Sequence, residues 1–180
     1  REVGAELRLF NGRDGEFTAS LEAIKKKSGI ASVGERTREQ TNEPGLRLLF
    51  APVKRGPVET IVQKVTEIGV TRLTPVVTER TVATKLNIGR LQAIAIEAAE
   101  QCGRVSIPSV DETIKLSALL DGWEEDTPLI YCDEAGDDAD AEWGGPKGRA
   151  LPALGAFKRL GVEARATILI GPEGGFTPDE

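Results

Sequence analysis

The sequence predicts an α/β domain with a mainly parallel sheet, preceded by part of a small β-domain. From Leu46 onward, apolar runs of strand length alternate with stretches whose apolar residues recur at helical spacing. Before Pro44 the chain shows short alternating stretches around the turn signal Asn11-Gly12. We therefore expect a partial β-domain with its linker over residues 1–44 and the α/β domain over residues 45–180.

The N-terminal region is typical of a hairpin followed by an exposed strand. Alternating stretches at residues 6–10 and 15–19 flank a segment that contains both Asn-Gly and Asp-Gly, which are strong hairpin signals. The polar stretch 34–43 is expected to form an exposed strand and then a linker.

The α/β domain is predicted from the order of its apolar patterns. The strands are expected at residues 46–51, 73–77, 128–132 and 166–170. The helices are expected at residues 57–69, 88–102 and 151–160. Pro57 suits a first helical position, and Gly69 suits a C-terminal cap. The predicted buried stripe of the second helix consists of Leu91, Ala95, Ala98 and Cys102.

The composition excludes several classes of protein. No apolar run approaches the roughly 18 residues that cross a bilayer, so we expect no membrane span. The absence of histidine removes Ser-His-Asp and Cys-His catalysis and most zinc sites. Cys102 and Cys132 lack a CxxC spacing, which predicts a cytoplasmic protein without a metal site. Because methionine is absent, we expect the chain to be a fragment of a longer protein.

The charge is unevenly distributed. The formal net charge is −6. Residues 111–150 hold twelve acidic and three basic side chains, a net −9, whereas residues 51–110 hold eight basic and five acidic ones, a net +3. A local basic face for RNA is therefore compatible with an acidic chain.

The first candidate site is the stretch 168–180. A buried strand runs into the glycine-rich turn 171–175, where a side chain at Gly174 is expected to fill the ligand's space and to strain φ. Ligands bind at the carboxyl ends of strands in open α/β sheets. The alternative is that the glycines only make a tight turn, but Pro172 and Glu173 stiffen and charge the loop. No lysine follows, so this is not the phosphate-binding loop of nucleotide hydrolases.

The second candidate site is the polar face of the predicted helix 88–102. Glu97, Gln101 and Arg104 lie at positions i, i+4 and i+7, opposite the apolar stripe. The alternative is an ordinary solvated face on which Glu100 pairs with Arg104. The small pair Ala98-Ala99 favours the first interpretation, because it lets another surface approach closely.

Four motifs in one order carry a resemblance to a known family. The segment 97–104 with Pro108 resembles an EAxEQxxR…P motif, and 171–176 resembles a GPEGGF loop. The segment 64–70 resembles a KATELGV helix end, and 78–81 resembles a TERS loop. Together they resemble the bacterial 16S rRNA uridine-N3 methyltransferases, which belong to the SPOUT superfamily.

The resemblance implies a fold, a cofactor and partners. It implies a SPOUT-type α/β knot, preceded by part of a PUA-like barrel that binds RNA, in a homodimer. It implies S-adenosylmethionine as cofactor and 16S rRNA or the small ribosomal subunit as partner, with methylation of uridine N3 as the reaction. The family's third cofactor loop has no counterpart, because the sequence stops at Glu180. The expected cofactor contacts are Cys132, Asp133, Ile170, Gly171, Pro172, Glu173, Gly174 and Gly175.

The roles of the site residues follow from the chemistry of uracil, whose N3 proton must leave. With no histidine, Arg104 is expected to stabilise negative charge on the uracil carbonyls, while Gln101 holds a base edge and Glu97 orients the arginine. Glu173 is expected to lie near the cofactor's sulfonium. Contacts to RNA phosphates are expected from Lys54, Arg55 and Arg80.

Two other functions remain open from the sequence. A Rossmann-type oxidoreductase is compatible with the strand–helix pattern, but it needs GxGxxG after the first strand, where the chain has 52–57 instead. A non-catalytic RNA-binding or ribosome-associated protein of the same fold is also compatible, although it leaves the GPEGG loop without a use.

Overall fold

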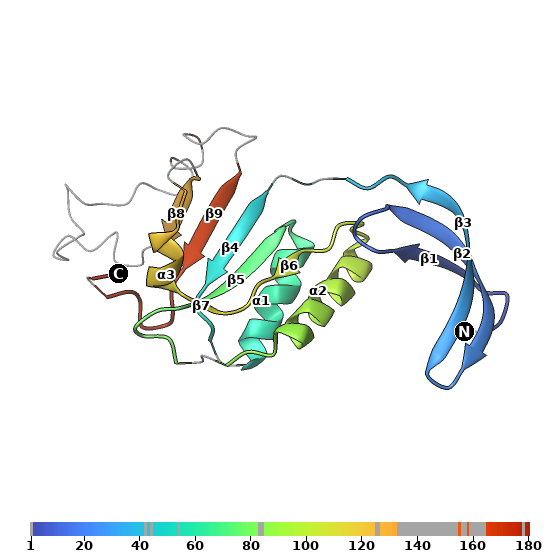
Figure 1. The fold of residues 1–180 in the computed structure, drawn as a ribbon, viewed down its shortest axis with the longest axis horizontal. Helices are drawn as coiled ribbons and strands as arrows, with labels where there is room; N and C mark the ends of the chain where they lie inside the picture. The colour runs from blue at the N-terminus through green and yellow to red at the C-terminus, as the bar shows by residue number, and fades with distance from the viewer. Residues whose placement is uncertain are drawn as a thin grey trace.

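The computed structural model divides the chain into two sheets at opposite ends of an elongated molecule (Figure 1). It describes residues 2–41, 43, 45–53, 55–82, 85–124, 127–132, 155, 158, 165–177 and 179–180. Within these ranges, no helix is long and apolar enough to cross a membrane.

The N-terminal sheet is antiparallel and has the strand order β1-β2-β3. Its strands are β1 (Glu6–Phe10), β2 (Glu16–Lys25) and β3 (Ser28–Arg38). The predicted hairpin is confirmed, and the Asn11 side chain holds its turn by accepting hydrogen bonds from the N–H groups of Arg13 and Asp14 at 3.0 and 2.9 Å. Gly15 has φ +90°, and a Cβ there would collide with the Arg38 carbonyl oxygen, so only glycine fits.

The second sheet is parallel, as predicted, and has the strand order β6-β5-β4-β9-β8. Its strands are β4 (Leu46–Phe50), β5 (Arg72–Val77), β6 (Ser109–Val110), β8 (Leu129–Cys132) and β9 (Ala166–Ile170), and β7 (Ile114–Lys115) also pairs with β5. Strand β9 therefore lies between β4 and β8, and the loops that follow these strands emerge at one edge, which we call the carboxyl edge.

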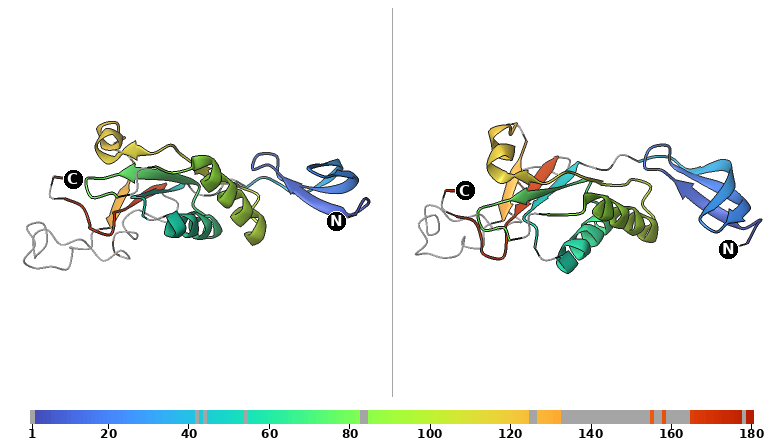
Figure 2. Two further views of the ribbon diagram at one scale, coloured as in Figure 1. Left: turned by 90° about the horizontal axis from the view of Figure 1, so that it is seen from below. Right: turned by 60° about the horizontal axis from the view of Figure 1, so that its bottom comes forward.

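Helices cover the two faces of this sheet unequally (Figure 2). Helices α1 (Arg55–Glu67) and α2 (Ile88–Cys102) lie together on one face, and the short α3 (Leu116–Asp121) lies on the other. The main core forms under α1 and α2 from Leu48, Phe50, Val58, Val62, Val70, Leu73, Leu91 and Ala95. A smaller core under α3 contains Leu49, Val76, Leu116 and Leu169.

Both long helices end in the same glycine motif. Gly69 has φ +102° and Gly103 has φ +72°, the left-handed conformation that glycine adopts without strain. After α1, the Val70 N–H donates to the Val65 carbonyl, and after α2, the Arg104 N–H donates to the Ala99 carbonyl, both at 3.0 Å. These are Schellman caps. They place both helix ends at the edge where the strands begin, which we call the amino edge.

Three details differ from the sequence predictions. Cys102 is exposed, and Ala99 joins Leu91, Ala95 and Ala98 in the buried stripe of α2, because Cys102 is the last residue of the helix and lies beyond the core that the helix covers. Ala98 and Ala99 are 2% and 0% exposed, so they face the protein's own core and offer no surface to a partner. Helix α3 and the two-residue strands β6 and β7 were not predicted, and the predicted helix at 151–160 falls mostly outside the described residues.

Candidate functional site

The glycine-rich turn leaves the carboxyl end of the interior strand β9. Pro172 and Gly175 are buried, whereas Glu173 and Gly174 are exposed, and a hydrogen bond of 2.9 Å from the Gly175 N–H to the Pro172 carbonyl closes the turn. The two buried residues therefore anchor the turn, and its exposed part projects into solvent, where its backbone is accessible to a ligand.

Two glycines of this turn are required, and neither is the one that we expected. A Cβ at Gly171 would lie 2.5 Å from Cε2 of Phe176, and Gly175 has φ +67°. Gly174 has no positive φ, and a Cβ there would contact Cδ of Arg80 at 3.6 Å, an ordinary separation. The prediction of backbone strain at Gly174 was wrong, because the left-handed residue of the turn is its last one.

The loop after β5 holds the glycine turn in place. Thr78 and Thr81 close this loop, since the Thr78 N–H donates to Oγ1 of Thr81 at 2.9 Å. Nη1 of Arg80 then donates to the Gly174 carbonyl oxygen at 2.7 Å, and the Glu79 N–H donates to Oε1 of Glu180 at 2.8 Å. The structure thus brings together two motifs that are far apart in the sequence.

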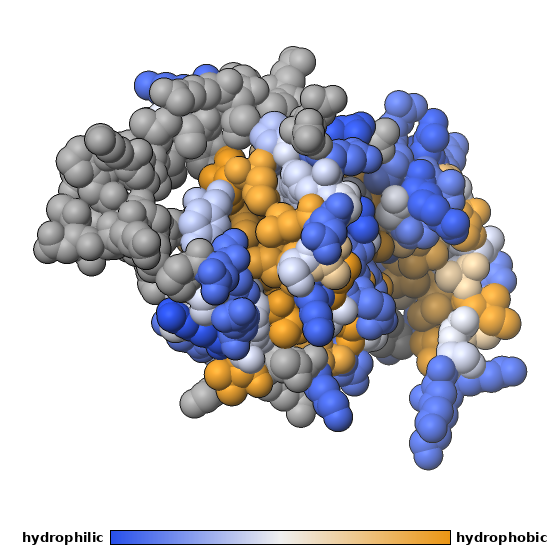
Figure 3. All heavy atoms as spheres, turned by 60° about the vertical axis from the view of Figure 1, so that its left-hand side comes forward, coloured by the Kyte–Doolittle hydropathy of each residue, from blue (hydrophilic) through white to orange (hydrophobic). Residues whose placement is uncertain are grey.

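An exposed apolar wall adjoins the glycine turn. Ile170 and Tyr131 are 46% and 43% exposed, although both lie at the ends of strands. The Tyr131 ring contacts the Phe176 ring, with centroids 4.8 Å apart. Figure 3, with this end of the molecule turned forward, shows apolar side chains gathered on its surface. A ligand with an aromatic or aliphatic part finds a matching surface there.

Cys132 pairs with Ile170 at the same end of strands β8 and β9. Cys132 as a whole residue is exposed. Its thiol is partly buried, and this burial raises the pKa of the thiol above the ordinary value. Its neighbour Asp133, also expected to contact the cofactor, lies outside the described residues.

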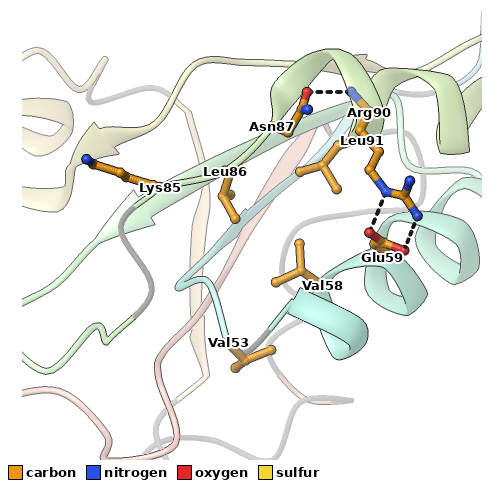
Figure 4. Close-up of a pocket in the computed structure, with 8 residues that line it drawn as sticks. All are labelled: Val53, Val58, Glu59, Lys85, Leu86, Asn87, Arg90 and Leu91. Atoms are coloured by element: carbon orange, nitrogen blue, oxygen red, sulfur yellow. Dashed lines mark hydrogen bonds and ion pairs between the residues drawn. The ribbon is translucent and has the colours of Figure 1, made fainter.

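A pocket of about 310 Å³ opens at the carboxyl edge between the first turns of α1 and α2 (Figure 4). Its apolar lining consists of Val53, Val58, Leu86 and Leu91. Its polar lining consists of Glu59, Lys85, Asn87 and Arg90.

The polar side of the pocket is fixed by a bidentate ion pair. Nε and Nη2 of Arg90 donate to the two carboxylate oxygens of Glu59 at 2.6 and 3.0 Å, and this bonding raises the pKa of Arg90. Asn87 caps α2 by accepting from the Arg90 N–H at 3.0 Å. Lys85 points away from the apolar side chains. The pocket combines an apolar interior with a rigid polar rim, the usual build of a small-molecule site.

The glycine turn, the loop that holds it and the pocket all lie at the edge where parallel sheets bind ligands. A model of the RNA methyltransferase domain matches residues 41–180 of this chain. The chain belongs to the RNA methyltransferase domain family.

Relatives of known name or structure agree with the family. The ribosomal RNA small subunit methyltransferase E of Rickettsia conorii is 28% identical over 179 residues, which cover 99% of this chain and 68% of that protein. A probable rRNA methyltransferase from Porphyromonas gingivalis superposes with a TM-score of 0.78 at 28% identity, covering 99% of this chain and 71% of that one. A putative methyltransferase from Legionella pneumophila, solved with bound S-adenosylmethionine, gives a TM-score of 0.75 at 31% identity, covering 99% of this chain and 70% of that one.

Family membership decides against the oxidoreductase alternative, and the topology agrees. In a Rossmann sheet the first strand neighbours the fourth strand of the chain. Here the first strand of the parallel sheet, β4, neighbours β9, which is the last described strand. The neighbour of the central strand β4 is therefore the last described strand of the chain, whereas in dinucleotide-binding proteins it is the fourth strand.

Of the residues predicted to contact RNA, those that the structure describes lie at the carboxyl edge of the methyltransferase domain. Arg80 is exposed in the loop that holds the glycine turn. Arg55 is the first residue of α1, beside the pocket residue Val53, but its side chain and all of Lys54 lie outside the described parts.

The predicted catalytic residues lie elsewhere. Glu97 and Gln101 are exposed on α2, and Arg104 follows the C-terminal end of that helix at the amino edge. Within one chain, the sheet therefore separates Arg104 from the glycine turn. Neither sequence spacing nor helical periodicity reveals this separation, because it depends on the direction in which α2 runs along the sheet.

Proposed function

We propose that the protein transfers the methyl group of S-adenosylmethionine to N3 of a uridine in 16S ribosomal RNA. Membership in the RNA methyltransferase family supports methyl transfer to RNA. The name of the Rickettsia relative supports the small-subunit rRNA as substrate. The choice of uridine N3 rests on the resemblance of the four motifs. The observation that carries the proposal is the glycine turn after β9, which Arg80 holds through a hydrogen bond to the Gly174 carbonyl oxygen.

The residues at the carboxyl edge fit the proposed cofactor. When bound, S-adenosylmethionine supplies a methyl group activated by a sulfonium. Ile170 and Tyr131 offer exposed apolar surface for its adenine, and the exposed backbone at Glu173 and Gly174 is open to close approach. Gly171, Pro172, Gly175 and Cys132 support these contacts from within the turn and from β8, and the Glu173 carboxylate has the charge that suits a sulfonium.

We assign the pocket between α1 and α2 to the target nucleotide. The apolar side chains of Val53 and Leu86 match the faces of a pyrimidine ring, and the Arg90–Glu59 pair presents polar atoms at the rim. Extrusion of a base from its stack into such a pocket is how enzymes reach an atom that is otherwise buried. The pocket and the glycine turn share one edge, so base and cofactor are brought to the same side of the sheet.

The chemistry asks the protein to position the base and to favour loss of its N3 proton. Holding the base and the cofactor in a productive geometry supplies much of the rate of such a displacement. A cation near the uracil carbonyls lowers the pKa of the base, and with no histidine in the chain this replaces a general base. Arg80, beside the glycine turn, and Arg90, at the rim of the pocket, are arginines with described side chains at the carboxyl edge. The assignment of Arg104, Gln101 and Glu97 as catalytic residues stays a prediction.

The larger assembly is also a proposal. We propose that the α/β domain from residue 45 is completed as a SPOUT knot in a homodimer, and that the sheet in residues 1–44 belongs to a PUA-like barrel that binds RNA. The family match, which starts at residue 41, is compatible with this division.

The test is methyl transfer by the full-length protein. Purified protein, radiolabelled S-adenosylmethionine and small ribosomal subunits from a strain that lacks the gene should give label in rRNA, and mass spectrometry of nucleosides should identify 3-methyluridine. A protein that binds rRNA but neither binds S-adenosylmethionine nor transfers label would instead be the non-catalytic RNA-binding protein that the sequence left open.

A further inference from the structure

We propose that Arg104 is a positioning residue that sets the N-terminal sheet against the methyltransferase domain, so that RNA held by one reaches the site on the other. This inference rests on the proposed function for its link to RNA, but its structural part stands on the contacts alone.

Arg104 reaches three separate parts of the chain. Its Nη1 donates to the carbonyl oxygens of Thr66 and Val70, the latter at 3.2 Å, which are the last carbonyls around the end of α1. Its Nη2 forms an ion pair with Glu43, in the segment that joins the two sheets. Nε and Nη2 also donate to Oγ of Ser106, at 3.2 and 3.0 Å. One side chain thus ties the end of α2 to the end of α1 and to the linker.

This arginine is built in rather than offered to a ligand. Its side chain is 9% exposed, and all three guanidinium nitrogens donate hydrogen bonds within the chain. A cation at the C-terminal end of α1 is also favoured by the helix dipole. Removing the guanidinium would leave the Glu43 carboxylate and the Val70 carbonyl without this partner, which is costly for partly buried groups, whereas the Thr66 carbonyl would keep its bond from the Gly69 N–H.

A second set of contacts crosses the same joint. Nη1 of Arg38, the last residue of β3, donates to the Gly103 carbonyl at 2.7 Å. Arg38 also lies 3.7 Å from Glu16, a buried carboxylate that Arg8 and Thr37 hold from the other strands. The first hairpin approaches the same segment, since a Cβ on Gly12 would lie 3.3 Å from Ile107.

The contacts of Arg38, Glu43 and Gly12 across this joint converge on residues 103–107, which follow α2 (Figure 1). The EQxxR motif therefore ends in a structural joint. Its arginine acts on the reaction by fixing where the N-terminal sheet stands, and it touches neither substrate nor cofactor within its own chain.

The kinetic test uses the full-length protein with saturating S-adenosylmethionine. We expect Arg104→Ala to raise KM for RNA by about tenfold, with kcat and cofactor affinity retained, because binding geometry and not chemistry is lost. Glu43→Gln and Arg38→Ala should shift KM in the same direction, and the Glu43→Gln effect should be non-additive with Arg104→Ala. Arg104→Lys should be intermediate, since a point charge cannot make the forked contacts.

Glu39→Gln is the matched control for Glu43→Gln, because it removes an exposed carboxylate whose pair with Arg36 does not cross to the methyltransferase domain, and it takes no cation away from the RNA. Its KM should stay near that of the wild type. A fall in kcat of about a hundredfold for Arg104→Ala, with unchanged KM and fully active Glu43→Gln and Arg38→Ala, would make Arg104 catalytic and overturn the inference. If Arg104→Ala does not fold, the KM values of Glu43→Gln and Arg38→Ala still test the inference.

A distance measurement tests the joint without any activity. Spin labels at the exposed positions Ser28 and Gln63, with both native cysteines replaced, report the separation of the sheet and α1. The distance distribution should be narrow in the parent and in Glu39→Gln, and broad in Arg104→Ala and Glu43→Gln. Equally narrow distributions in all four would refute the joint. A broad Arg104→Ala distribution, together with no methyl transfer by the unlabelled wild-type protein, would leave the joint standing and refute the proposed function.

Discussion

The guanidinium of Arg80 donates to the carbonyl oxygen of Gly174 at 2.7 Å, across 94 positions of sequence. This bond joins the loop after β5 to the turn after β9 at the carboxyl edge. At the opposite edge, Arg104 joins the ends of α1 and α2. The four motifs of the sequence thus assemble in pairs, one pair around the candidate cofactor site and one pair around the joint to the N-terminal sheet.

Arg80→Ala should weaken S-adenosylmethionine binding by about tenfold, because a charged hydrogen bond that positions the glycine turn is lost. Calorimetry on the folded variant measures this, with Arg36→Ala as the control for a lost surface arginine. Unchanged cofactor affinity together with weaker, less salt-dependent RNA binding would instead assign Arg80 to an RNA phosphate, as the sequence predicted.

Gly171→Ala should destabilise the protein by about 1–3 kcal/mol, because its Cβ would force the Phe176 ring to move. Gly175→Ala should cost about 1–2 kcal/mol, since its φ of +67° is strained for a residue with a Cβ. Gly174→Ala, which meets only ordinary contacts, is the control and should be near neutral. Denaturant unfolding gives the three values, and equal losses at all three positions would contradict the geometry of the turn.

Alkylation of Cys132 should be slow at neutral pH and speed up as the pH rises, because burial raises the pKa of its thiol and the thiolate is the reactive form. Saturating S-adenosylmethionine should slow it further. Cys102, at the opposite edge, serves as the internal control, and mass spectrometry resolves the two sites. Protection of Cys102 rather than Cys132 would move the cofactor away from β8.

Glu16 should make stability depend on pH. Its hydrogen bonds with Arg8 and Thr37 lower its pKa in the folded state below the unfolded value. Its contribution is therefore present above the ordinary carboxyl pKa and is lost as the pH falls through the lowered one. Glu16→Gln should be less stable than the wild type at pH 7, and the difference should shrink at strongly acidic pH, whereas exposed Glu22→Gln should show neither effect. Thermal unfolding of the three proteins at several pH values measures this.

Filling the pocket between α1 and α2 should raise KM for RNA without changing the affinity for S-adenosylmethionine. Leu86→Trp places a large ring where the target base is proposed to lie, and we expect KM for RNA to rise by about tenfold with unchanged S-adenosylmethionine affinity. Val82→Trp, at a residue that is 87% exposed in the same loop region, is the control and should leave both constants unchanged. Loss of cofactor affinity in Leu86→Trp would show that the pocket belongs to the cofactor.

Local patterns were sufficient for most of the secondary structure. The bounds of α2 and β9 agree with the prediction, because Asn87 and Gly103 cap the helix and a short apolar run defines the strand. Helix α3 was missed because its six residues carry too few turns to show a period. The assignment of Gly174 as the strained residue failed for a related reason, since composition identifies a glycine turn but not which glycine takes the positive φ.

The sequence by itself determined that this is an α/β protein with a glycine turn after its last apolar strand, because strand length, helical period and turn chemistry are local properties. The tertiary structure alone decided which motifs meet. Arg80 contacts Gly174 because β5 and β9 both pair in parallel with β4. The loops after β5 and β9 therefore reach the same edge of the sheet. Arg104 finds Thr66 and Glu43 because α2 runs back toward the amino edge, where α1 and the linker also end. Contacts across 38 and 61 positions leave no periodic trace in a sequence, because they depend on strand order and helix direction, which packing of the whole core sets.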